Sequence, residues 1–202
     1  MGKGEATREF IVDEALSQAI RLGLEGLTLG VLADTLGLSK SGLFAHFRSK
    51  EALQIAVLEE AVARFAGKVL EPAMTEPEGK ARLETLFHRY LDWIKGGKET
   101  VGCLFMTAAQ EFDDRPGVVR DRLVSAQTEW RAILAHTVSD AIARKELRAD
   151  IDPKQMAFEI VGIALVYQQS TKLLQDYAAG ARAKRAFEAL LARAARSKRK
   201  LS

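Results

Sequence analysis

Residues 28–53 read TLGVLADTLGLSKSGLFAHFRSKEAL and contain two short amphipathic segments on either side of a glycine. Thr28 precedes the first segment and Ser39 the second, and both residue types cap helices because their hydroxyl accepts a free backbone N–H. Gly37 lies between them, where a glycine with positive φ commonly ends a helix. The stretch therefore predicts one helix from Leu29 to Leu36, a tight turn, and a second short helix running to about Phe47.

The apolar residues of this stretch are spaced as a small core. A helix-turn-helix needs two helices at a steep angle, a tight glycine-containing turn and apolar side chains between them. The side chains available for that core are Leu32, Ala33, Leu36, Leu38, Leu43 and Phe47. Two packed helices of any function could share such a core, so the exposed face of the second helix has to decide what the pair does.

That exposed face is locally basic. From residue 39 to residue 50 the charged side chains are Lys40, Arg48 and Lys50, with no acidic residue, although acidic residues outnumber basic ones over residues 1–60 as a whole. Phosphate contacts require local positive charge, and hydroxyls and backbone N–H groups at helix N-termini add to it. The patch predicts a nucleic-acid contact surface.

Gly42 lies inside the second short helix, where glycine costs about 1 kcal/mol relative to alanine. Two explanations are open. A close approach of the helix backbone to the wall of a DNA groove would require the missing side chain. Alternatively, the glycine relieves crowding against the preceding helix.

The whole stretch resembles the DNA-binding signature of the TetR (tetracycline-repressor-like) family. The shared pattern is a threonine opening the helix, a small residue within it, a glycine-containing turn, a Leu-aromatic-x-His-Phe block and Ser-Lys-Glu, here at 28–51. The resemblance implies that the second short helix enters the major groove. It implies a DNA-contacting set made of Thr28, Ser39, Lys40, Ser41, Gly42, Phe44, Ala45, His46 and Lys50.

Within that set the resemblance gives individual roles. Thr28 would cap its helix and bond a phosphate, and His46 and Lys50 would contact the DNA backbone. Phe44 stands where the family commonly has tyrosine, which leaves an apolar contact such as a thymine methyl. Ala45 stands where the family has a larger residue, so its short side chain offers almost nothing to contact a base. We therefore expect sequence specificity to differ from that of relatives at these two positions.

The rest of the chain is also helical in pattern. Ile11, Ala15, Leu16 and Ala19 form one apolar stripe, and further helices are predicted over about 50–70, 79–95, 101–112, 117–147, 153–176 and 180–197. No hairpin turn or sustained alternation predicts a strand. We expect an all-α protein of about nine helices. Its predicted domains are a helix-turn-helix head at 1–50, extending into a connecting helix at 50–70, and a ligand-binding and dimerisation body at 71–202.

The last two predicted helices favour a homodimer interface. Residues 157–166 are apolar on nearly all sides, and the final helix carries many alanines. A monomeric core helix is the alternative. A dimer would place two short reading helices on successive turns of double-stranded DNA and match a palindromic operator.

Aromatic and soft side chains gather in the body. In the resembled family this region binds an effector, and an apolar pocket with few polar groups suits a small, mostly apolar molecule. The candidate lining residues are Phe87, Tyr90, Trp93, Phe105, Met106, Trp130 and Tyr167, and core packing is the alternative for each.

Composition limits the remaining function classes. The chain has 202 residues, a net charge of +3 and one cysteine, Cys103, and it shows neither a signal peptide nor a long apolar run. We expect a cytoplasmic location and no membrane association. Scattered histidines and the absence of a nucleophile or phosphate-loop motif argue against an enzyme, a metal or a cofactor. The run of basic residues at Arg196–Lys200 predicts a tail that lies in solvent.

The function predicted is a sequence-specific DNA-binding transcriptional regulator, a repressor that a small molecule releases from its operator. Movement of the helix beginning at Lys50 would change the separation of the two reading helices and weaken binding. Two alternatives are a helical ligand-binding or protein-interaction module without DNA binding, and an activator built on the same plan.

Overall fold

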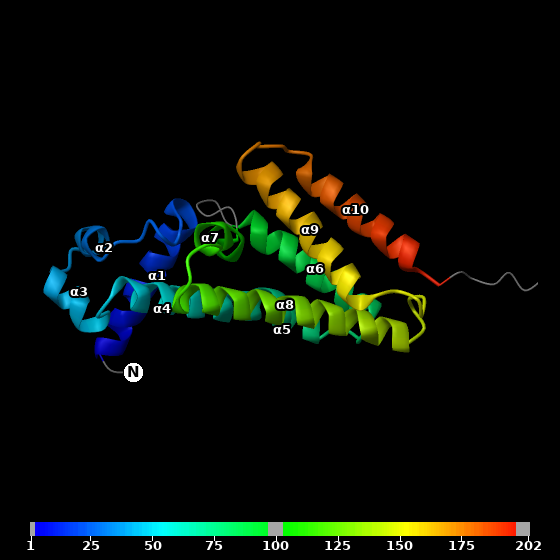
Figure 1. Ribbon diagram of the computed structural model, residues 1–202, viewed down its shortest axis with the longest axis horizontal. Coiled ribbons are helices and arrows are strands. Elements are labelled where there is room, and N and C mark those ends of the chain that lie inside the picture. Colours follow the sequence, from blue (N-terminus) through cyan, green and yellow to red (C-terminus); the bar gives the residue numbers. More distant parts are fainter. Residues whose placement is uncertain (1–2, 97–102, 197–202) are drawn as a thin grey trace, which may run out of the picture. The chain divides into compact units, whose positions relative to one another are not determined.

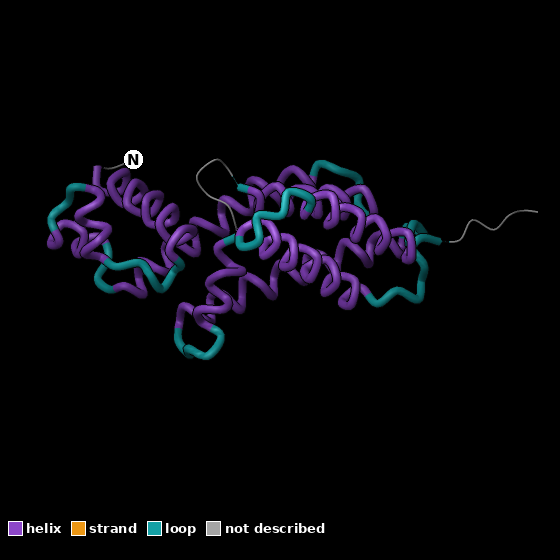
Figure 2. The backbone as a smooth tube through the Cα atoms, turned by 90° about the horizontal axis from the view of Figure 1, so that it is seen from above, coloured by secondary structure: helices purple, strands orange, loops and turns teal. Residues whose placement is uncertain are grey.

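The computed structural model describes residues 3–96 and 103–196, and every element of regular structure in these ranges is a helix (Figure 1, Figure 2). The first four are α1 (Lys3–Leu22), α2 (Leu29–Leu36), α3 (Lys40–His46) and α4 (Lys50–Phe65). A π-helical turn, η1 (Ala66–Leu70), continues α4 into α5 (Glu71–Met74). The others are α6 (Lys80–Lys95), α7 (Leu104–Phe112), α8 (Val118–Ala143), α9 (Pro153–Lys172) and α10 (Ala179–Ala194).

The predicted fold class is confirmed. With α4, η1 and α5 taken as one continuous rod, the described residues form nine helical rods, and their one β-like pairing is an isolated bridge between Leu147 and Ala195. The chain divides into two compact units. The first contains residues up to Phe65 together with 97–127, and the second contains 66–96 and the chain from Thr128 onward.

The first unit is built on α1, which packs against α4, α2 and α7. The predicted stripe on α1 is its buried face, because Ile11, Ala15, Leu16 and Ala19 are all fully or almost fully buried. Helix α7 adds Leu104, Ala108 and Phe112 to the same core. A segment distant in sequence, α7, therefore completes the core of the N-terminal unit. The predicted division of the chain into a DNA-binding head and a ligand-binding body at residues 70 and 71 concerns function and stays a prediction.

The second unit packs α6 against α9, and α9 lies beside α10 (Figure 1). The rings of Phe87 and Phe187 stack with centroids 3.9 Å apart and join α6 to α10. Tyr90 meets Trp130 edge to face at 5.0 Å, which ties α6 to α8. Aromatic pairs of this geometry add to the free energy of burial.

Four helix ends differ from the predicted ones, and one of them is that of α10, which ends at Ala194, three residues before the predicted end. The connecting helix continues past Leu70 because Pro72 lies in the first turn of α5, where a missing N–H breaks no bond. Helix α8 stops at Ala143, and Lys145 takes a positive φ of 62° just after it. Helix α9 ends at Lys172, four residues before the predicted end. The predicted helix start at 101 and the end of the basic tail lie outside the described residues.

Candidate nucleic-acid interface

Side-chain caps define the start of each helix in the 28–53 stretch. The Oγ1 of Thr28 accepts the N–H of Val31 at 3.2 Å and opens α2. The Oγ of Ser39 accepts the N–H of Gly42 at 3.0 Å and opens α3, and the Oγ of Ser49 accepts the N–H of Ala52 at 3.1 Å at the start of α4. These caps satisfy backbone donors that would otherwise have only water as partner.

The turn between α2 and α3 is made by Gly37. Its φ of 64° lies in the left-handed region, and the N–H of the following Leu38 bonds back to the carbonyl of Ala33 at 2.9 Å. This pattern closes α2 and sends the chain directly into the cap of α3. The sequence prediction of two helices joined by a glycine turn is confirmed.

The predicted core beneath the two helices is also confirmed. Leu32, Ala33, Leu43 and Phe47 are buried, and Leu36 and Leu38 pack partly buried against them. The guanidinium of Arg8 on α1 lies 5.1 Å from the centroid of the Phe47 ring, which adds a cation–π contact under α3.

The opposite face of α3 is open. Lys40, Ser41, Gly42, Phe44 and Ala45 are all exposed, and Phe44 shows half of its surface to solvent. Val31 is similarly exposed on α2, at 54 %. At this exposure half of a large apolar side chain stays uncovered in the monomer, so α3 presents a ring and short polar groups together. His46 is only half-buried at the end of the helix.

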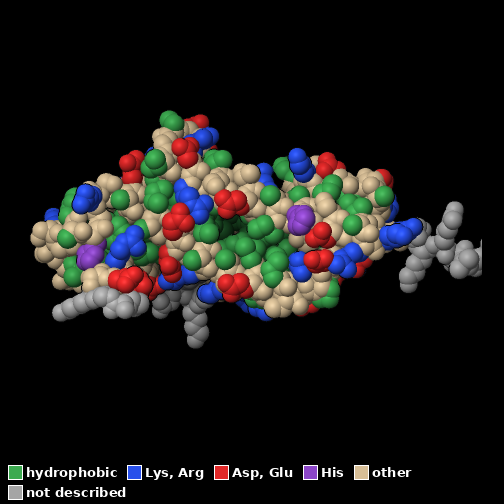
Figure 3. All heavy atoms as spheres, turned by 90° about the horizontal axis from the view of Figure 1, so that it is seen from below, with side chains coloured by type: hydrophobic (Ala, Val, Ile, Leu, Met, Phe, Trp, Pro, Cys, Tyr) green, Lys and Arg blue, Asp and Glu red, His purple; other side chains and the backbone are tan. Residues whose placement is uncertain are grey.

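The charges of this face are available for an outside partner. Within the described residues neither Lys40 nor Arg48 forms an ion pair, and both are exposed. Arg48 belongs to the predicted basic patch but not to the predicted contact residues, and its exposure adds it to the candidates. Elsewhere charge is mixed, since on the face shown in Figure 3 Lys and Arg lie among Asp and Glu. Nucleic-acid affinity would therefore depend on this local patch.

Gly42 lies beside the cap of α3 and has open space around it. A Cβ at position 42 would lie 3.0 Å from the Oγ of Ser39, and no other atom outside its own stretch of helix lies within 4 Å of that point. Crowding against α2 is therefore not the reason for the glycine. The exposed Gly42 leaves room for the Ser39 hydroxyl on one side and an open backbone on the other.

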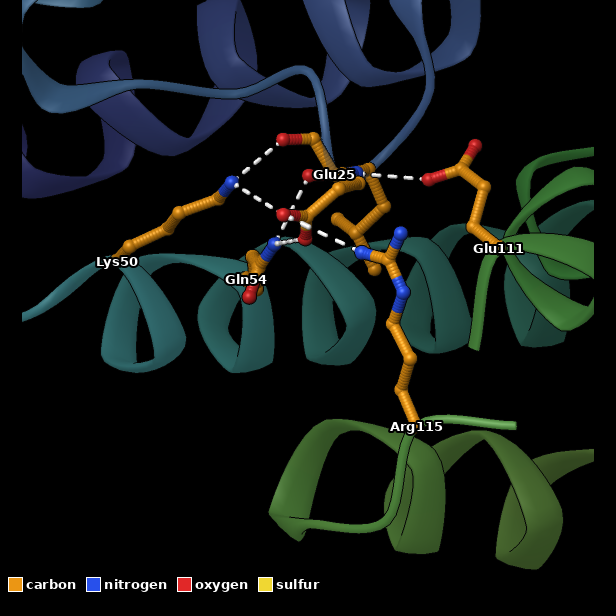
Figure 4. A network of polar contacts seen from close by, with 6 residues as sticks. Glu25, Lys50, Gln54, Glu111 and Arg115 are labelled. Atoms are coloured by element: carbon orange, nitrogen blue, oxygen red, sulfur yellow. Dashed lines mark hydrogen bonds and ion pairs between the residues drawn. The ribbon is translucent and has the colours of Figure 1, made fainter. Parts of the chain in front are cut away.

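Lys50 differs from the other predicted contacts. Its Nζ donates to the backbone carbonyl of Glu25 at 2.5 Å and lies 3.0 Å from Oε1 of the same residue (Figure 4). This ion pair and the hydrogen bond from Lys50 hold the pKa of the Glu25 carboxyl below its ordinary value, against the opposing effect of burial. The predicted phosphate contact of Lys50 would have to compete with Glu25.

The predicted pocket residues lie in both units. Phe105 packs against the core of the first unit, whereas Phe87 and Tyr90 are buried in the second. Tyr167 lines a hollow of about 620 Å³ in the second unit, together with side chains of α6 and α10 such as Asp92 and Lys184. Burial raises the pKa of the Tyr167 phenol. The lining role of the seven candidates stays a prediction.

Neither a membrane-spanning helix nor a metal-binding cluster is found in residues 3–96 and 103–196. None of their helices has the combined length and apolar character needed to cross a bilayer. In the same ranges no group of three or more His, Cys, Asp or Glu side chains is placed to hold a metal ion.

Two family models match the chain. The model described as "Bacterial regulatory proteins, tetR family" matches residues 11–57, and "Tetracyclin repressor-like, C-terminal domain" matches residues 79–187. The first covers α2 and α3 with their caps. The second covers more than half of the chain.

Individual proteins agree with the models. The HTH-type transcriptional repressor AcnR of Corynebacterium diphtheriae is 36% identical over 69 residues, 34% of this chain and 36% of its own length. The uncharacterized regulator YobS of Bacillus subtilis is 23% identical over 123 residues, 61% of this chain and 62% of its own length. The chain thus matches less than two thirds of either relative.

Solved structures match over a greater length. A TetR transcriptional regulator from Chloroflexus aurantiacus has a TM-score of 0.83 at 23% identity and covers 95% of this chain and 96% of its own. AibR, solved in complex with isovaleryl coenzyme A and operator DNA, has a TM-score of 0.68 at 20% identity and covers 80% and 85%. These structures support the fold, and the family models identify the protein: the chain belongs to the tetR family of bacterial regulatory proteins.

Proposed function

We propose that the protein is a sequence-specific DNA-binding transcriptional regulator, a repressor that a small molecule releases from a palindromic operator in the cytoplasm. The observation that carries the proposal is the open face of α3. Lys40, Ser41 and Phe44 are exposed side by side on a helix whose other face is buried. Such a helix offers a phosphate contact, a hydrogen-bonding group and an apolar contact to one groove.

We assign phosphate contacts to Thr28, Lys40 and Arg48, and base contacts to Ser41 and Phe44. We assign to His46 a further contact with the DNA backbone. Gly42 and Ala45 are small and allow α3 to approach the groove closely. The name of AcnR as a repressor and the operator DNA in the AibR complex support DNA binding by analogy, while the residue assignment rests on the exposed groups of α3 and its neighbours. An activator would use the same DNA surface, and a reporter gene placed behind the bound DNA separates repression from activation.

We place the homodimer interface on α9 and α10. Phe158, Leu165 and Val166 of α9 are exposed at 62, 43 and 62 %, although they are large and apolar. Ala186 and Ala189 are exposed on the neighbouring helix α10. Exposed apolar residues beside small ones let a second helix pair pack closely. Sedimentation of a Val166→Asp variant, which places a charge on this face, should show a monomer that keeps its helical signal.

We place effector binding in the second unit, where the aromatic residues Tyr90, Trp93, Trp130 and Tyr167 gather. The isovaleryl coenzyme A in the AibR structure supports a small-molecule effector of some kind. The continuous rod α4–η1–α5 passes from the first unit into the second, so it is the proposed link between effector and DNA. The effector can shift DNA affinity only by its own preference for one of the two states.

The test is the salt dependence of DNA binding. DNA selected from a random pool by the full chain would be bound by wild type, Lys40→Met and the matched control Arg89→Met, which removes an exposed positive charge of α6, away from the proposed interface helices. Each lost phosphate contact lowers the slope of log K against log salt by about 0.9, so Lys40→Met should lower it by about 1.8 in a dimer. Arg89→Met should leave it unchanged. Equal slopes for all three proteins would refute the assignment.

A further inference from the structure

The loop between α1 and α2 is held from two sides by side chains of distant elements (Figure 4). From α7, the Oε2 of Glu111 accepts the backbone N–H of Glu25 at 2.7 Å. From the start of α4, the Nζ of Lys50 bonds the carbonyl oxygen of Glu25 at 2.5 Å. Both backbone groups of one loop residue are therefore satisfied by charged side chains, which form the stronger class of hydrogen bond.

Further contacts surround the same residue. Gln54, which is buried, donates from Nε2 to the carbonyl of Leu24 at 3.0 Å. The Nη1 of Arg115 lies 3.4 Å from Oε1 of Glu25, the carboxylate oxygen that also faces Lys50. We call Glu25 with Lys50, Gln54, Glu111 and Arg115 the loop clamp.

Gly23 shows that the loop and Glu111 are fitted to each other. Its φ of 87° lies in the left-handed region, and a Cβ there would overlap the carboxylate of Glu111. A side chain at position 23 would displace Glu111 from the N–H that it accepts. The buried glycine therefore leaves the space that Glu111 needs to take its place in the loop clamp.

The contacts of the loop clamp leave the charge of Lys50 less available for a DNA phosphate. A lysine whose ammonium already bonds a carboxylate and a carbonyl brings little free charge to a phosphate. Lys40 and Arg48, on the neighbouring helix and turn, have no such partner in the described residues. The loop, in turn, ends at the cap of α2, so its position sets where Thr28 and the helix pair begin.

We propose that Lys50 and Glu111 are positioning residues for the DNA-reading helices, which they hold through Glu25, and that Lys50 does not contact a phosphate. The proposal rests on the proposed DNA-binding function. Glu111 lies within the segment matched by the C-terminal family model, so this part of the chain grips the head directly.

The first arm of the test asks whether removal of the Glu111 carboxylate weakens or strengthens DNA binding. Removing an acidic residue from a DNA-binding protein strengthens binding when only long-range charge matters. Loss of the clamp has the opposite effect: Glu111→Ala should bind the selected DNA about tenfold more weakly, the size expected for one lost hydrogen bond to a charged group. Glu111→Gln keeps an oxygen that accepts the N–H of Glu25 and should restore most of the affinity.

Asp114→Ala is the matched control, because Asp114 is an exposed acid of the same region and lines the same hollow as Glu25 and Glu111. It should bind as tightly as wild type or more tightly. Unchanged or tighter binding by Glu111→Ala would overturn the proposal.

The second arm uses the salt slope of Lys50→Met beside that of Lys40→Met. A positioning role predicts weaker binding with an unchanged slope for Lys50→Met and a lower slope for Lys40→Met. A slope lowered by the same amount in both variants would overturn the assignment of Lys50.

A third arm needs no DNA. The amide hydrogen of Glu25 should exchange with solvent faster in Glu111→Ala than in wild type and Glu111→Gln. If wild type binds no DNA, the proposed function fails while this exchange still reports on the clamp. If exchange at Glu25 is the same in all three proteins, the clamp itself is refuted.

Discussion

The hydroxyl of Ser39 accepts the N–H of Gly42 at 3.0 Å, and a Cβ at position 42 would lie 3.0 Å from the same hydroxyl, which would have to shift slightly to make room for it. The equivalent positions after the other two caps are Val31 and Ala52, so a cap of this kind is compatible with a Cβ. Glycine at position 42 therefore leaves the exposed first turn of α3 bare, although the cap does not require it.

Replacing the cap tests its two roles separately. Ser39→Ala should lower the free energy of unfolding by about 1 kcal/mol, because the N–H of Gly42 loses its acceptor. Ser39→Asp keeps an acceptor and should retain stability, yet it places a negative charge on the DNA face and should bind DNA more weakly than wild type. Urea denaturation and DNA titration measure the two effects. Equal DNA affinity for the Asp variant and wild type would show that Ser39 lies away from DNA.

Gly42→Ala should separate stability from function. Alanine gains about 1 kcal/mol in helix propensity, and the slight shift that its Cβ imposes on the Ser39 hydroxyl offsets part of that gain. We expect a small net change in the urea midpoint and a clear loss of DNA affinity, since the methyl group stands between backbone and groove. If DNA affinity were unaffected, the backbone of α3 would not approach the groove at this turn.

Phe44 should influence sequence preference more than stability. Half of its surface is exposed, so Phe44→Ala should lower the urea midpoint much less than truncation of a fully buried core residue would. Loss of an apolar contact to a thymine methyl should relax selection at one base pair in each half-site, where a good base contact contributes about 1–3 kcal/mol. Comparison of the DNA pools selected by the two proteins measures this. Identical pools would remove Phe44 from the base-reading residues.

The Glu25–Lys50 ion pair should give a pH dependence of known sign. Because the pKa of Glu25 is lowered below 4.5 in the folded protein, the pair stabilises fully above that pH and is lost as pH falls through the lowered pKa. The difference in urea midpoint between wild type and Lys50→Met should be constant above about pH 5.5 and shrink toward pH 3. A difference that grows on acidification would mean that another group carries the stabilisation.

Local chemistry made much of the fold predictable. The caps at Thr28, Ser39 and Ser49 and the turn at Gly37 depend on neighbours within five residues, so sequence alone placed α2, α3 and the start of α4. The apolar stripe on α1 was equally local. Pro72 misled the prediction because its effect depends on the π-helical turn before it, which restarts the helix with the proline in its first turn.

Contacts between distant segments were not predictable. Glu25 and Glu111 are 86 positions apart, and no periodicity relates a backbone N–H of this loop to a carboxylate on α7. The same limit hid the membership of α7 in the N-terminal unit, which follows from burial of Leu104 and Phe112 against α1. Lys50 could be placed in a basic patch by its charge, but its partner could be seen only in three dimensions.

Selection of random double-stranded DNA by the protein tests the DNA-reading role of α3 most directly. The selected pool should be enriched in a palindrome whose half-sites have centres about 10 base pairs apart, or a multiple of that spacing, because two copies of α3 must enter successive major grooves. Lys40→Met should recover the same sequence with lower affinity. Failure of the wild-type protein to enrich any sequence over the starting pool would contradict sequence-specific DNA binding by α3.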